Sequence, residues 1–446
     1  MHTRTVRVTL APLLAAVCAT AAADPPAVPP QRVGQARAVL DAFVKEDYAA
    51  AGKDFDETMR KAFPEEKRRE LWAKLIKQVG PFKGHAGART ERKAPYDVVN
   101  LTCRFEKADI VFHVAFDADG KVSGFRLSAA HPAYDFKPPP YARPDSYREE
   151  EVTVGAGRWA LPGTLTIPKG DGPFPAVVLV HGSGSNDRDQ TIGPNKVLRD
   201  LAWGLASQGI AVLRYEKRTR HYADRLRPEE VTVKEEVLDD ALAAVAVLRG
   251  RKEVDAQRIF VAGHSLGGYL APKLGTLDPQ LAGLIVLAGP TRPLEDLIVE
   301  QVDYLSRLEG EPDATDKKDL EKLREKAARV KSPDLKPDTP SDQLPLGWPA
   351  VYWLSLRGYD PAATAAGLKM PLLVLRGERD YQVTATDFDG WKKALGGRRD
   401  VRLKTYPGLN HLFIEGSGKP SPADYEKAGH VSKEVVDDIA AWVKGR

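Results

Sequence analysis

Cysteine is scarce in this chain, which has only Cys18 and Cys103 among its 446 residues. Because Cys18 lies in an N-terminal segment that we expect to be removed, the mature chain keeps Cys103 alone. One cysteine cannot close an intramolecular disulfide, and a chain of this length does not require one even in an oxidising compartment. Cys103 lies in a strand-like stretch, and we expect it to be a small core residue.

An excess of charge of one sign is also lacking. The chain has 66 basic and 62 acidic residues, which gives a formal charge of +4. This balance provides no case for a nucleic-acid partner, which would need basic residues clustered on one face. Hydrophobic residues make up 42% and charged residues 29% of the chain, which is ordinary globular composition and excludes a disordered chain. The length favours two domains over one.

Long hydrophobic runs are missing, apart from a short one near the N-terminus. Residues 8–17 are apolar but too few to span a bilayer, Arg4 and Arg7 precede them, and small residues follow at 21–23. This order is typical of a secretory signal peptide at 1–23. It predicts a bacterial protein that is exported to the periplasm or secreted, with no membrane span.

Two alternatives for this segment remain. A buried N-terminal helix is disfavoured by the prolines of a linker at 24–31, since proline breaks helices. Lipidation at Cys18 is disfavoured by Val17, which is a poor residue directly before a lipid-modified cysteine.

Residues 32–137 are expected to form a small α+β domain. Helical periodicity comes first and strand-like stretches follow, an order typical of this class. The expected helices are 36–48 and 65–79, and the expected strands are 98–105, 110–116 and 122–127. The sequence at 117–120, Asp-Ala-Asp-Gly, predicts a hairpin turn between the last two strands. Prolines at 138–140 and 144 mark the boundary to the next domain.

A different pattern extends over residues 145–446. Short runs that are apolar on both faces alternate with helical patterns, which indicates a mostly parallel sheet covered on both sides. The expected strands are 176–180, 211–213, 259–262, 284–288, 372–375 and 402–406, and the expected helices include 197–207, 237–248 and 431–443. The sequence therefore predicts a doubly wound α/β domain.

The stretch 291–367 separates two of these strands and is far longer than an ordinary connection. It holds a charged helical segment at 316–330, followed by an aromatic segment around Trp348, Trp353 and Tyr359. We interpret the insertion as a helical lid over the site. A solvated helical decoration is the alternative.

The segment 263–267, Gly-His-Ser-Leu-Gly, has the G-x-S-x-G pattern of a nucleophile elbow. It directly follows the apolar strand 259–262 and precedes a helix start rich in small residues, which is the setting that the pattern requires. Such a tight turn strains the serine backbone and leaves no room for side chains two residues to either side. We therefore expect Ser265 to be a nucleophile rather than an incidental serine in a glycine turn.

A serine hydroxyl needs an adjacent base to become a nucleophile. His411 alone among the nine histidines combines a position after Ser265 with a loop between the last strand and the last helix. The acid that orients this imidazole should lie between the two, at the end of a core strand. Asp380 fits that position, and Glu378 and Asp387 are nearby rivals.

An oxyanion requires donors that already point at it. The N–H of Leu266, directly after the nucleophile, is expected to supply one. The second should come from the glycine-rich loop at 181–184, with the Ser183 N–H as first choice and the Gly182 N–H as second. The loop and the elbow are expected to lie two strands apart. A plain glycine turn is the alternative.

Two further polar groups follow strands of the same sheet. Residues 186–189 could line the pocket, bind a cation through Asp187 and Asp189, or only cap the loop, and the last is the default interpretation. Residues 215–218, Tyr-Glu-Lys-Arg, could brace the site through an ion pair, and their default role is structural.

These motifs resemble the α/β-hydrolase superfamily over residues 145–446. The segments HGSGSNDRD, YEKR, GHSLGG and RGERDYQV together are similar to bacterial esterases of the dienelactone-hydrolase-like group. Those esterases often carry an N-terminal domain of unknown function that looks like the NTF2-like fold, which residues 32–131 resemble. The resemblance implies ester hydrolysis through an acyl-enzyme, with no cofactor and no metal. Ser265 replaces the cysteine of dienelactone hydrolases proper, which puts dienelactone substrates in doubt.

The leading functional hypothesis is hydrolysis of small-molecule esters with small to medium acyl chains. A thioesterase or a peptidase would use the same three residues, and sequence does not decide between them. A non-catalytic binding module is a further hypothesis, which the intact set Ser265, Asp380 and His411 opposes. Whether the N-terminal domain forms a homodimer, closes the pocket or does neither is left open.

Overall fold

The computed structural model describes residues 28–446 except 94–95, 130–135, 224 and 309. The signal peptide expected at 1–23 lies outside the described residues. Contacts divide the chain into two compact units, Met1–Pro132 and Ala133–Arg446. Within the described ranges, no helix combines the length and the apolar character that a membrane crossing needs.

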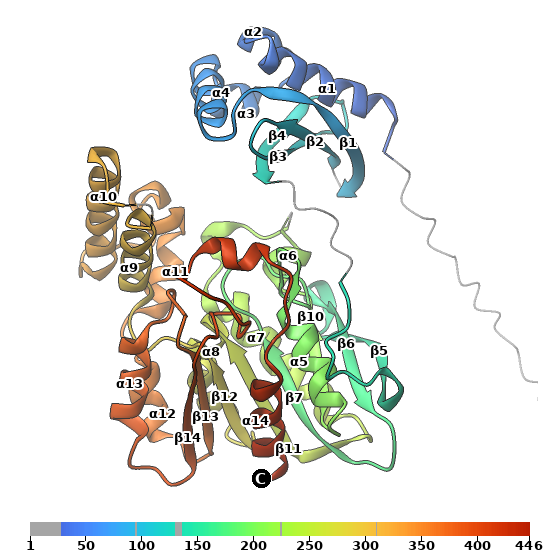
Figure 1. Ribbon diagram of the computed structural model, residues 1–446, viewed down its shortest axis with the longest axis vertical. Helices are drawn as coiled ribbons and strands as arrows, with labels where there is room; N and C mark the ends of the chain where they lie inside the picture. The colour runs from blue at the N-terminus through green and yellow to red at the C-terminus, as the bar shows by residue number, and fades with distance from the viewer. Residues whose placement is uncertain (1–27, 94–95, 130–135, 224, 309) are drawn as a thin grey trace, which may run out of the picture. The chain divides into compact units, whose positions relative to one another are not determined.

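The N-terminal unit contains short helices followed by one antiparallel sheet (Figure 1). Its helices are α1 (Gln31–Val44), α2 (Tyr48–Ala51), α3 (Glu57–Ala62) and α4 (Glu65–Val79). Its strands pair in the order β1 (Phe82–Lys93), β2 (Tyr96–Phe105), β3 (Asp109–Phe116) and β4 (Val122–Ala129). Buried and less buried residues alternate along β2 and β3, so one face of the sheet packs into an apolar core with the helices. This arrangement confirms the predicted α+β class, although β1 was not expected.

The second unit is built on one eight-stranded sheet. Its strands lie in the order β14 (Val401–Tyr406), β13 (Leu372–Gly377), β12 (Gly283–Leu287), β11 (Val254–His264), β7 (Phe174–Val180), β10 (Ala211–Tyr215), β6 (Leu161–Pro168) and β5 (Tyr147–Val154). The pairs from β14 to β10 are parallel, and β6 and β5 extend the sheet as antiparallel strands. The predicted α/β class with a mostly parallel sheet is confirmed.

Helices cover both faces of this sheet, which explains why its central strands are apolar on both sides (Figure 1). One face packs against α5 (Val197–Ala206) and α14 (Lys433–Lys444). The other packs against α7 (Asp239–Arg249), α8 (Leu266–Leu277) and α13 (Ala385–Leu395). Strands β7 and β11 are hydrogen-bonded neighbours, so the loops that follow them lie side by side rather than two strands apart as expected.

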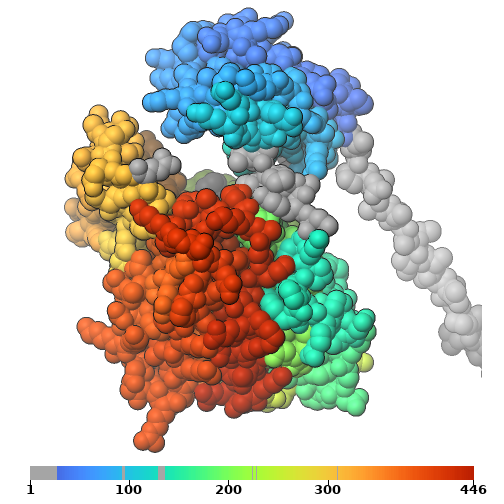
Figure 2. Space-filling model, in the orientation of Figure 1, coloured from blue at the N-terminus to red at the C-terminus, as the bar shows by residue number. Residues whose placement is uncertain are grey.

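The described residues of the long insertion between β12 and β13 form four α-helices, α9 (Leu294–Ser306), α10 (Ala314–Lys331), α11 (Ala350–Leu356) and α12 (Pro361–Gly367). The last of these, α12, packs on α8 and α13 and so belongs to the helical layer of the sheet. The other three share a small apolar core of their own, formed by residues such as Ile298, Val330 and Trp353. Figure 2 shows the yellow part of the insertion projecting from the orange and red body of the same unit.

Candidate active site

Ser265 lies in the tight turn between β11 and α8, with a backbone φ of +52°. This left-handed conformation is strained for serine and turns the residue out of the sheet. A Cβ atom at Gly263 would come within 2.1 Å of the Gly267 oxygen, and one at Gly267 within 2.6 Å of the Val180 oxygen. The turn therefore requires both glycines. Ser265 is partly exposed while the residues on either side of it are buried.

His411 and Asp380 form a buried pair at the ends of neighbouring strands. The Nδ1 of His411 lies 2.7 Å from Oδ2 of Asp380, and both side chains are almost fully excluded from solvent. The second carboxylate oxygen of Asp380 accepts hydrogen bonds from the backbone N–H groups of Gln382 and Val383. Since these donors hold the carboxylate in place, Asp380 can fix the orientation of the imidazole.

The two rival carboxylates have other partners. Glu378 is exposed and accepts a hydrogen bond from the Thr405 hydroxyl. Asp387 is buried, but it accepts hydrogen bonds from the Thr291 and Arg292 backbone and pairs with the Arg292 guanidinium at 2.8 Å. Of the three carboxylates, Asp380 is the one that the structure places against His411.

His264 connects the elbow to the loop that carries His411. Its ring lies 4.7 Å, centroid to centroid, from the His411 ring, and its Nε2 donates to the His411 carbonyl oxygen at 2.9 Å. Its Nδ1 accepts a hydrogen bond from the Gln190 side-chain amide at 2.7 Å. Burial lowers the pKa of His264 to about 3, with the neighbouring His411 adding to the effect, so the ring is neutral at ordinary pH. The elbow thus lies beside His411, although no hydrogen bond joins Ser265 and His411 in this structure.

The loop after β7 lies directly against the nucleophile. A Cβ atom at Gly182 would be 3.2 Å from the Cβ of Ser265, so a larger residue would crowd the serine. The Gly182 N–H already donates to Gln190 Oε1 at 2.8 Å, in a buried hydrogen bond. This bond engages the Gly182 N–H, which was our second choice as a donor to an oxyanion. The N–H groups of Ser183 and Leu266 remain as the two candidates.

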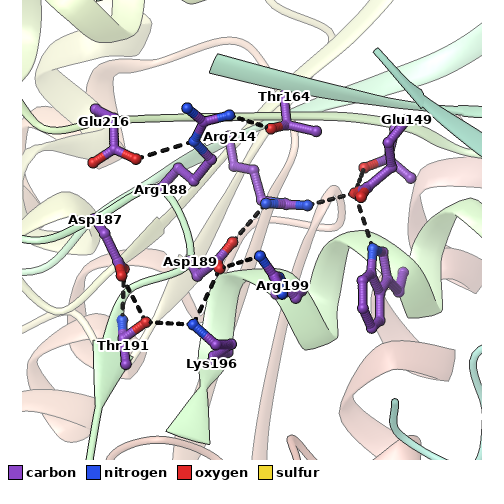
Figure 3. A network of polar contacts seen from close by, with 12 residues as sticks. Glu149, Thr164, Asp187, Arg188, Asp189, Thr191, Lys196, Arg199, Arg214 and Glu216 are labelled. Carbon is purple, nitrogen blue, oxygen red and sulfur yellow. Dashed lines mark hydrogen bonds and ion pairs between the residues drawn. The ribbon is translucent and has the colours of Figure 1, made fainter. Parts of the chain in front are cut away.

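The carboxylates of Asp187 and Asp189 are occupied by hydrogen bonds and ion pairs to other protein groups rather than arranged around a cation (Figure 3). Asp187 accepts hydrogen bonds from the backbone and hydroxyl of Thr191. Asp189 is buried and pairs with Arg214 at 2.5 Å and with Arg199 at 2.6 Å. Figure 3 shows these contacts as part of one network that ties this loop to β10 and α5. Among the residues that the structure describes, no cluster of three or more histidine, cysteine or acidic side chains is placed to hold a metal ion.

Three residues of the segment 215–218, which follows β10, form ion pairs. Glu216 pairs with Arg188 at 3.0 Å, Lys217 pairs with Glu236 at 2.6 Å, and Arg218 pairs with Asp240. Gln190 and Glu236 were not singled out from the sequence, because neither belongs to a motif. His264 occupies a variable position of the elbow pattern, which gave no signal for its role.

Comparison with protein families now adds to this geometry. Residues 172–416 match the hydrolase family described as serine aminopeptidase, S33, and residues 36–125 match a family described as a protein of unknown function, DUF3887. The first match spans more than half of the chain and includes the elbow, Asp380 and His411. The chain belongs to this hydrolase family. The expected resemblance, a serine-hydrolase unit preceded by a domain of unknown function, is confirmed.

The chain is also similar to individual proteins. The chain is 42% identical over 374 residues to Esterase EstD of Thermotoga maritima, which covers 84% of this chain and 86% of that protein. This stretch is longer than the second unit, so it includes part of the N-terminal unit. Esterase FrsA of Klebsiella pneumoniae is 29% identical over 150 residues, or 33% of this chain and 32% of that protein. Among solved structures, an esterase from Pyrococcus furiosus matches 70% of this chain and 99% of its own at 16% identity, with a TM-score of 0.43.

Proposed function

We propose that this protein hydrolyses carboxylic esters, with Ser265 as nucleophile, His411 as general base and Asp380 as the acid that orients His411. The observation that carries the proposal is the 2.7 Å contact between His411 Nδ1 and Asp380 Oδ2, in a loop that packs against the residue before Ser265. The esterase relative that matches most of the chain supports the same activity. The elbow strains Ser265 into a partly exposed position, which suits attack on a bound ester.

The reaction proceeds in two acyl-transfer steps. Ser265 Oγ attacks the ester carbonyl while His411 Nε2 takes the hydroxyl proton, and the N–H groups of Leu266 and Ser183 stabilise the oxyanion. His411 then gives that proton to the departing alkoxide, which leaves as an alcohol. In the second step His411 takes a proton from water, the hydroxide adds to the acyl-enzyme, and Ser265 leaves with the proton as the acid is released.

We assign the small to medium acyl or alcohol group of the substrate to the cavity beside the loop after β7, which is lined by residues of that loop and not by Ser265 or His411 themselves. This cavity has a volume of about 310 Å³, close to the smallest ligand pockets of proteins. Gly184 and Ser185 line it on one side, and Leu226, Trp348 and Tyr352 give it apolar and aromatic walls. Such walls favour an uncharged, compact group.

Export to the periplasm or the medium is part of the proposal and rests on the sequence of residues 1–23. Expression of the full chain in a bacterial host, followed by N-terminal sequencing of the protein in the periplasmic fraction, tests it. A mature chain that starts near residue 24 supports export. An uncleaved chain confined to the cytoplasm contradicts it.

The activity is tested with p-nitrophenyl esters from acetate to palmitate, with Ser265→Ala as the matched control. Hydrolysis of the shorter chains that disappears in the variant supports the proposal and measures the acyl pocket. Thioesters and aminoacyl p-nitroanilides are assayed in parallel, because the family description names an aminopeptidase. Turnover of the anilides alone would replace the ester proposal with a peptidase.

A further inference from the structure

Lys217 is a buried lysine whose ammonium group lies behind the loop that follows β7. Its side chain is almost completely excluded from solvent. The Nζ atom donates to the carbonyl oxygen of Gly182 at 2.7 Å and to Oε1 of Glu236 at 2.6 Å. Burying an ammonium group costs desolvation free energy, which its ion pair and hydrogen bonds must offset.

The carbonyl of Gly182 belongs to the same peptide group as the N–H of Ser183. A trans peptide group is planar, and its C=O and N–H point in opposite directions. An anchor on the Gly182 oxygen therefore fixes the direction of the Ser183 N–H. This N–H is one of the two donors that the proposed reaction needs, and Gly182 lies against Ser265.

Further contacts prevent the glycine from rotating. Glycine is the residue whose backbone changes conformation most easily, so a peptide group after it is prone to flip. Here the Gly182 N–H is held by Gln190, and the Asn186 side-chain amide donates to the oxygens of Gly182 at 3.2 Å and of Ser183 at 2.9 Å. Lys217 is the charged member of this set of anchors.

A charged donor on the carbonyl also changes the strength of the N–H on the other side of the peptide group. Hydrogen bonds to charged groups are about twice as strong as neutral ones, and connected hydrogen bonds polarise each other. The Lys217 ammonium draws electron density toward the Gly182 oxygen and makes the Ser183 N–H a better donor. This effect is greatest when negative charge develops on the substrate oxygen.

Glu236 links this lysine to the helical insertion. It lies in the π-helical turn Lys234–Leu238, and its second oxygen accepts a hydrogen bond from the Tyr352 hydroxyl of α11 at 2.6 Å. Both Glu236 and Tyr352 are buried, and both line the cavity beside the loop. Three hydrogen bonds, from Tyr352 to Glu236 and from Lys217 to Glu236 and to Gly182, thus connect the insertion to the peptide group beside Ser265.

From this arrangement we infer that Lys217 is a positioning residue for the oxyanion, which orients and polarises the peptide group between Gly182 and Ser183. The inference rests on the proposed function, because it concerns the same reaction. Lys217 acts through the peptide group and does not touch the substrate. Glu236 and Tyr352 hold its ammonium in place from the side of the insertion.

Lys217→Met in the full-length chain removes the charge and keeps a side chain of similar length. The expected result is a loss in kcat of about 10- to 100-fold on the best p-nitrophenyl ester, less than the loss of a whole oxyanion donor, with KM changed less than about threefold. The affinity for an alkyl trifluoromethyl ketone, which forms an oxyanion on the nucleophile, should fall by a similar factor. A purely structural lysine would not lower the two quantities together.

Arg218→Met is the matched control, because Arg218 is the next residue and forms a buried pair with Asp240 on a different helix. We expect kcat and ketone affinity within about threefold of the wild type in this variant, whatever its loss of stability. Lys217→Met with losses no larger than those of the control overturns the inference. If the wild type hydrolyses no ester at all, the proposed function fails instead.

Asn186→Ala gives a second test, in which the substituted residue is not in the buried core and the variant should fold. Asn186 is partly exposed, and its amide supports the same carbonyl group. A loss of about 3- to 10-fold in kcat at constant KM is expected, because one of the two side-chain donors to the Gly182 oxygen is removed. An unchanged kcat and ketone affinity in Asn186→Ala, when Lys217→Met does not fold, overturns the inference.

Discussion

The imidazole of His264 donates a hydrogen bond from Nε2 to the carbonyl oxygen of His411 at 2.9 Å. A carbonyl oxygen only accepts, so Nε2 carries the proton and Nδ1 is free to accept from Gln190. The Gln190 oxygen accepts in turn from the Gly182 N–H. Each of these three buried hydrogen bonds therefore pairs a donor with an acceptor, and together they join the three loops that the proposed reaction uses.

His264→Phe should lower both activity and stability. The substitution leaves the Gln190 amide and the His411 carbonyl without their partner, at about 1–3 kcal/mol for each buried group. It also releases the His411 loop, and we expect kcat to fall at least about tenfold as the base loses its position. Urea unfolding and ester hydrolysis measure the two effects.

His430→Phe is the control for this substitution. His430 is a partly buried histidine whose hydrogen bonds and ion pair go to Asp200. The His430→Phe variant should lose some stability and keep the kcat of the wild type. A His264→Phe enzyme with the kcat of the control would show that the chain of hydrogen bonds has no part in the reaction.

The stability effect of His264→Phe should depend on pH. Burial holds the pKa of His264 at about 3 in the folded protein, whereas the pKa of a histidine in an unfolded chain is about 6.5. Between these values the unfolded state binds more protons, so the wild type loses stability as the pH falls below about 6.5. The loss linked to this residue reaches about 2 kcal/mol at about pH 5.

The phenylalanine variant has no such group, so its destabilisation relative to the wild type should be about 2 kcal/mol smaller at about pH 5 than at about pH 7.5. Comparing the two proteins at each pH cancels the contribution of other titrating groups, such as Asp240, whose pKa burial raises to about 6. An equal difference at both pH values would mean that His264 has the same pKa in the folded protein as in the unfolded chain.

Asp380→Asn should lower kcat by about 10³- to 10⁴-fold with little change in KM, because the amide no longer holds the reactive tautomer of His411. Glu378→Gln and Asp387→Asn are the matched controls, since both carboxylates lie close in sequence and neither contacts His411. Glu378→Gln should be neutral, and Asp387→Asn should lose stability while it keeps kcat. A large loss of kcat in either control would assign the orienting acid to that residue.

The parts that could be predicted from sequence are those with local signals. The central strands of the large sheet are continuous apolar runs, and Ser265 and Asp380 each follow such a strand. His411 follows the less apolar edge strand β14, in the order of a known fold. Strand β1 had no such signal, because its sequence, FKGHAGARTERK, has few apolar residues. It lies at the edge of its sheet and is defined by pairing with β2, which no local pattern reveals.

The supporting residues of the site were harder to predict for a related reason. Gln190 contacts His264 across 74 residues of sequence, and Lys217 contacts Gly182 across 35. Such pairs meet only because β7, β10 and β11 lie side by side and end at one edge of the sheet. The order of strands in the sheet is a tertiary property, so these hydrogen bonds became visible only in the structure.

Cys103 should be inert to thiol reagents in the folded protein. The side chain is fully buried in the N-terminal core, and burial raises the pKa of the thiol to about 12, so the reactive thiolate is rare at neutral pH. Mature protein treated with Ellman's reagent should release no thiolate until urea is added, and then one equivalent. Rapid reaction of the native protein would show that this core opens.

Asp189→Asn should destabilise the loop that follows β7. Asp189 is buried and pairs with Arg214 and Arg199, and Arg214 is itself almost fully excluded from solvent (Figure 3). Arg214 keeps its ion pair with Glu149 in this variant, so the cost should be below about 3–5 kcal/mol, the range that is typical of a buried charge left without any partner. Asp187→Asn is the control, because its carboxylate hydrogen-bonds Thr191, and its loss should cost about 1 kcal/mol.

Asp187 and Asp189 lie two residues apart in one loop, so the two variants can be compared directly. For each variant, stability and activity are measured separately. Urea unfolding of both variants gives the stability, and ester hydrolysis well below each melting temperature gives kcat. Asp189→Asn should lower kcat as well, since the loop it anchors to β10 also carries the Ser183 N–H. A variant that unfolds early yet keeps full kcat would show that Asn186, Gln190 and Lys217 hold that N–H without help from the ion pairs.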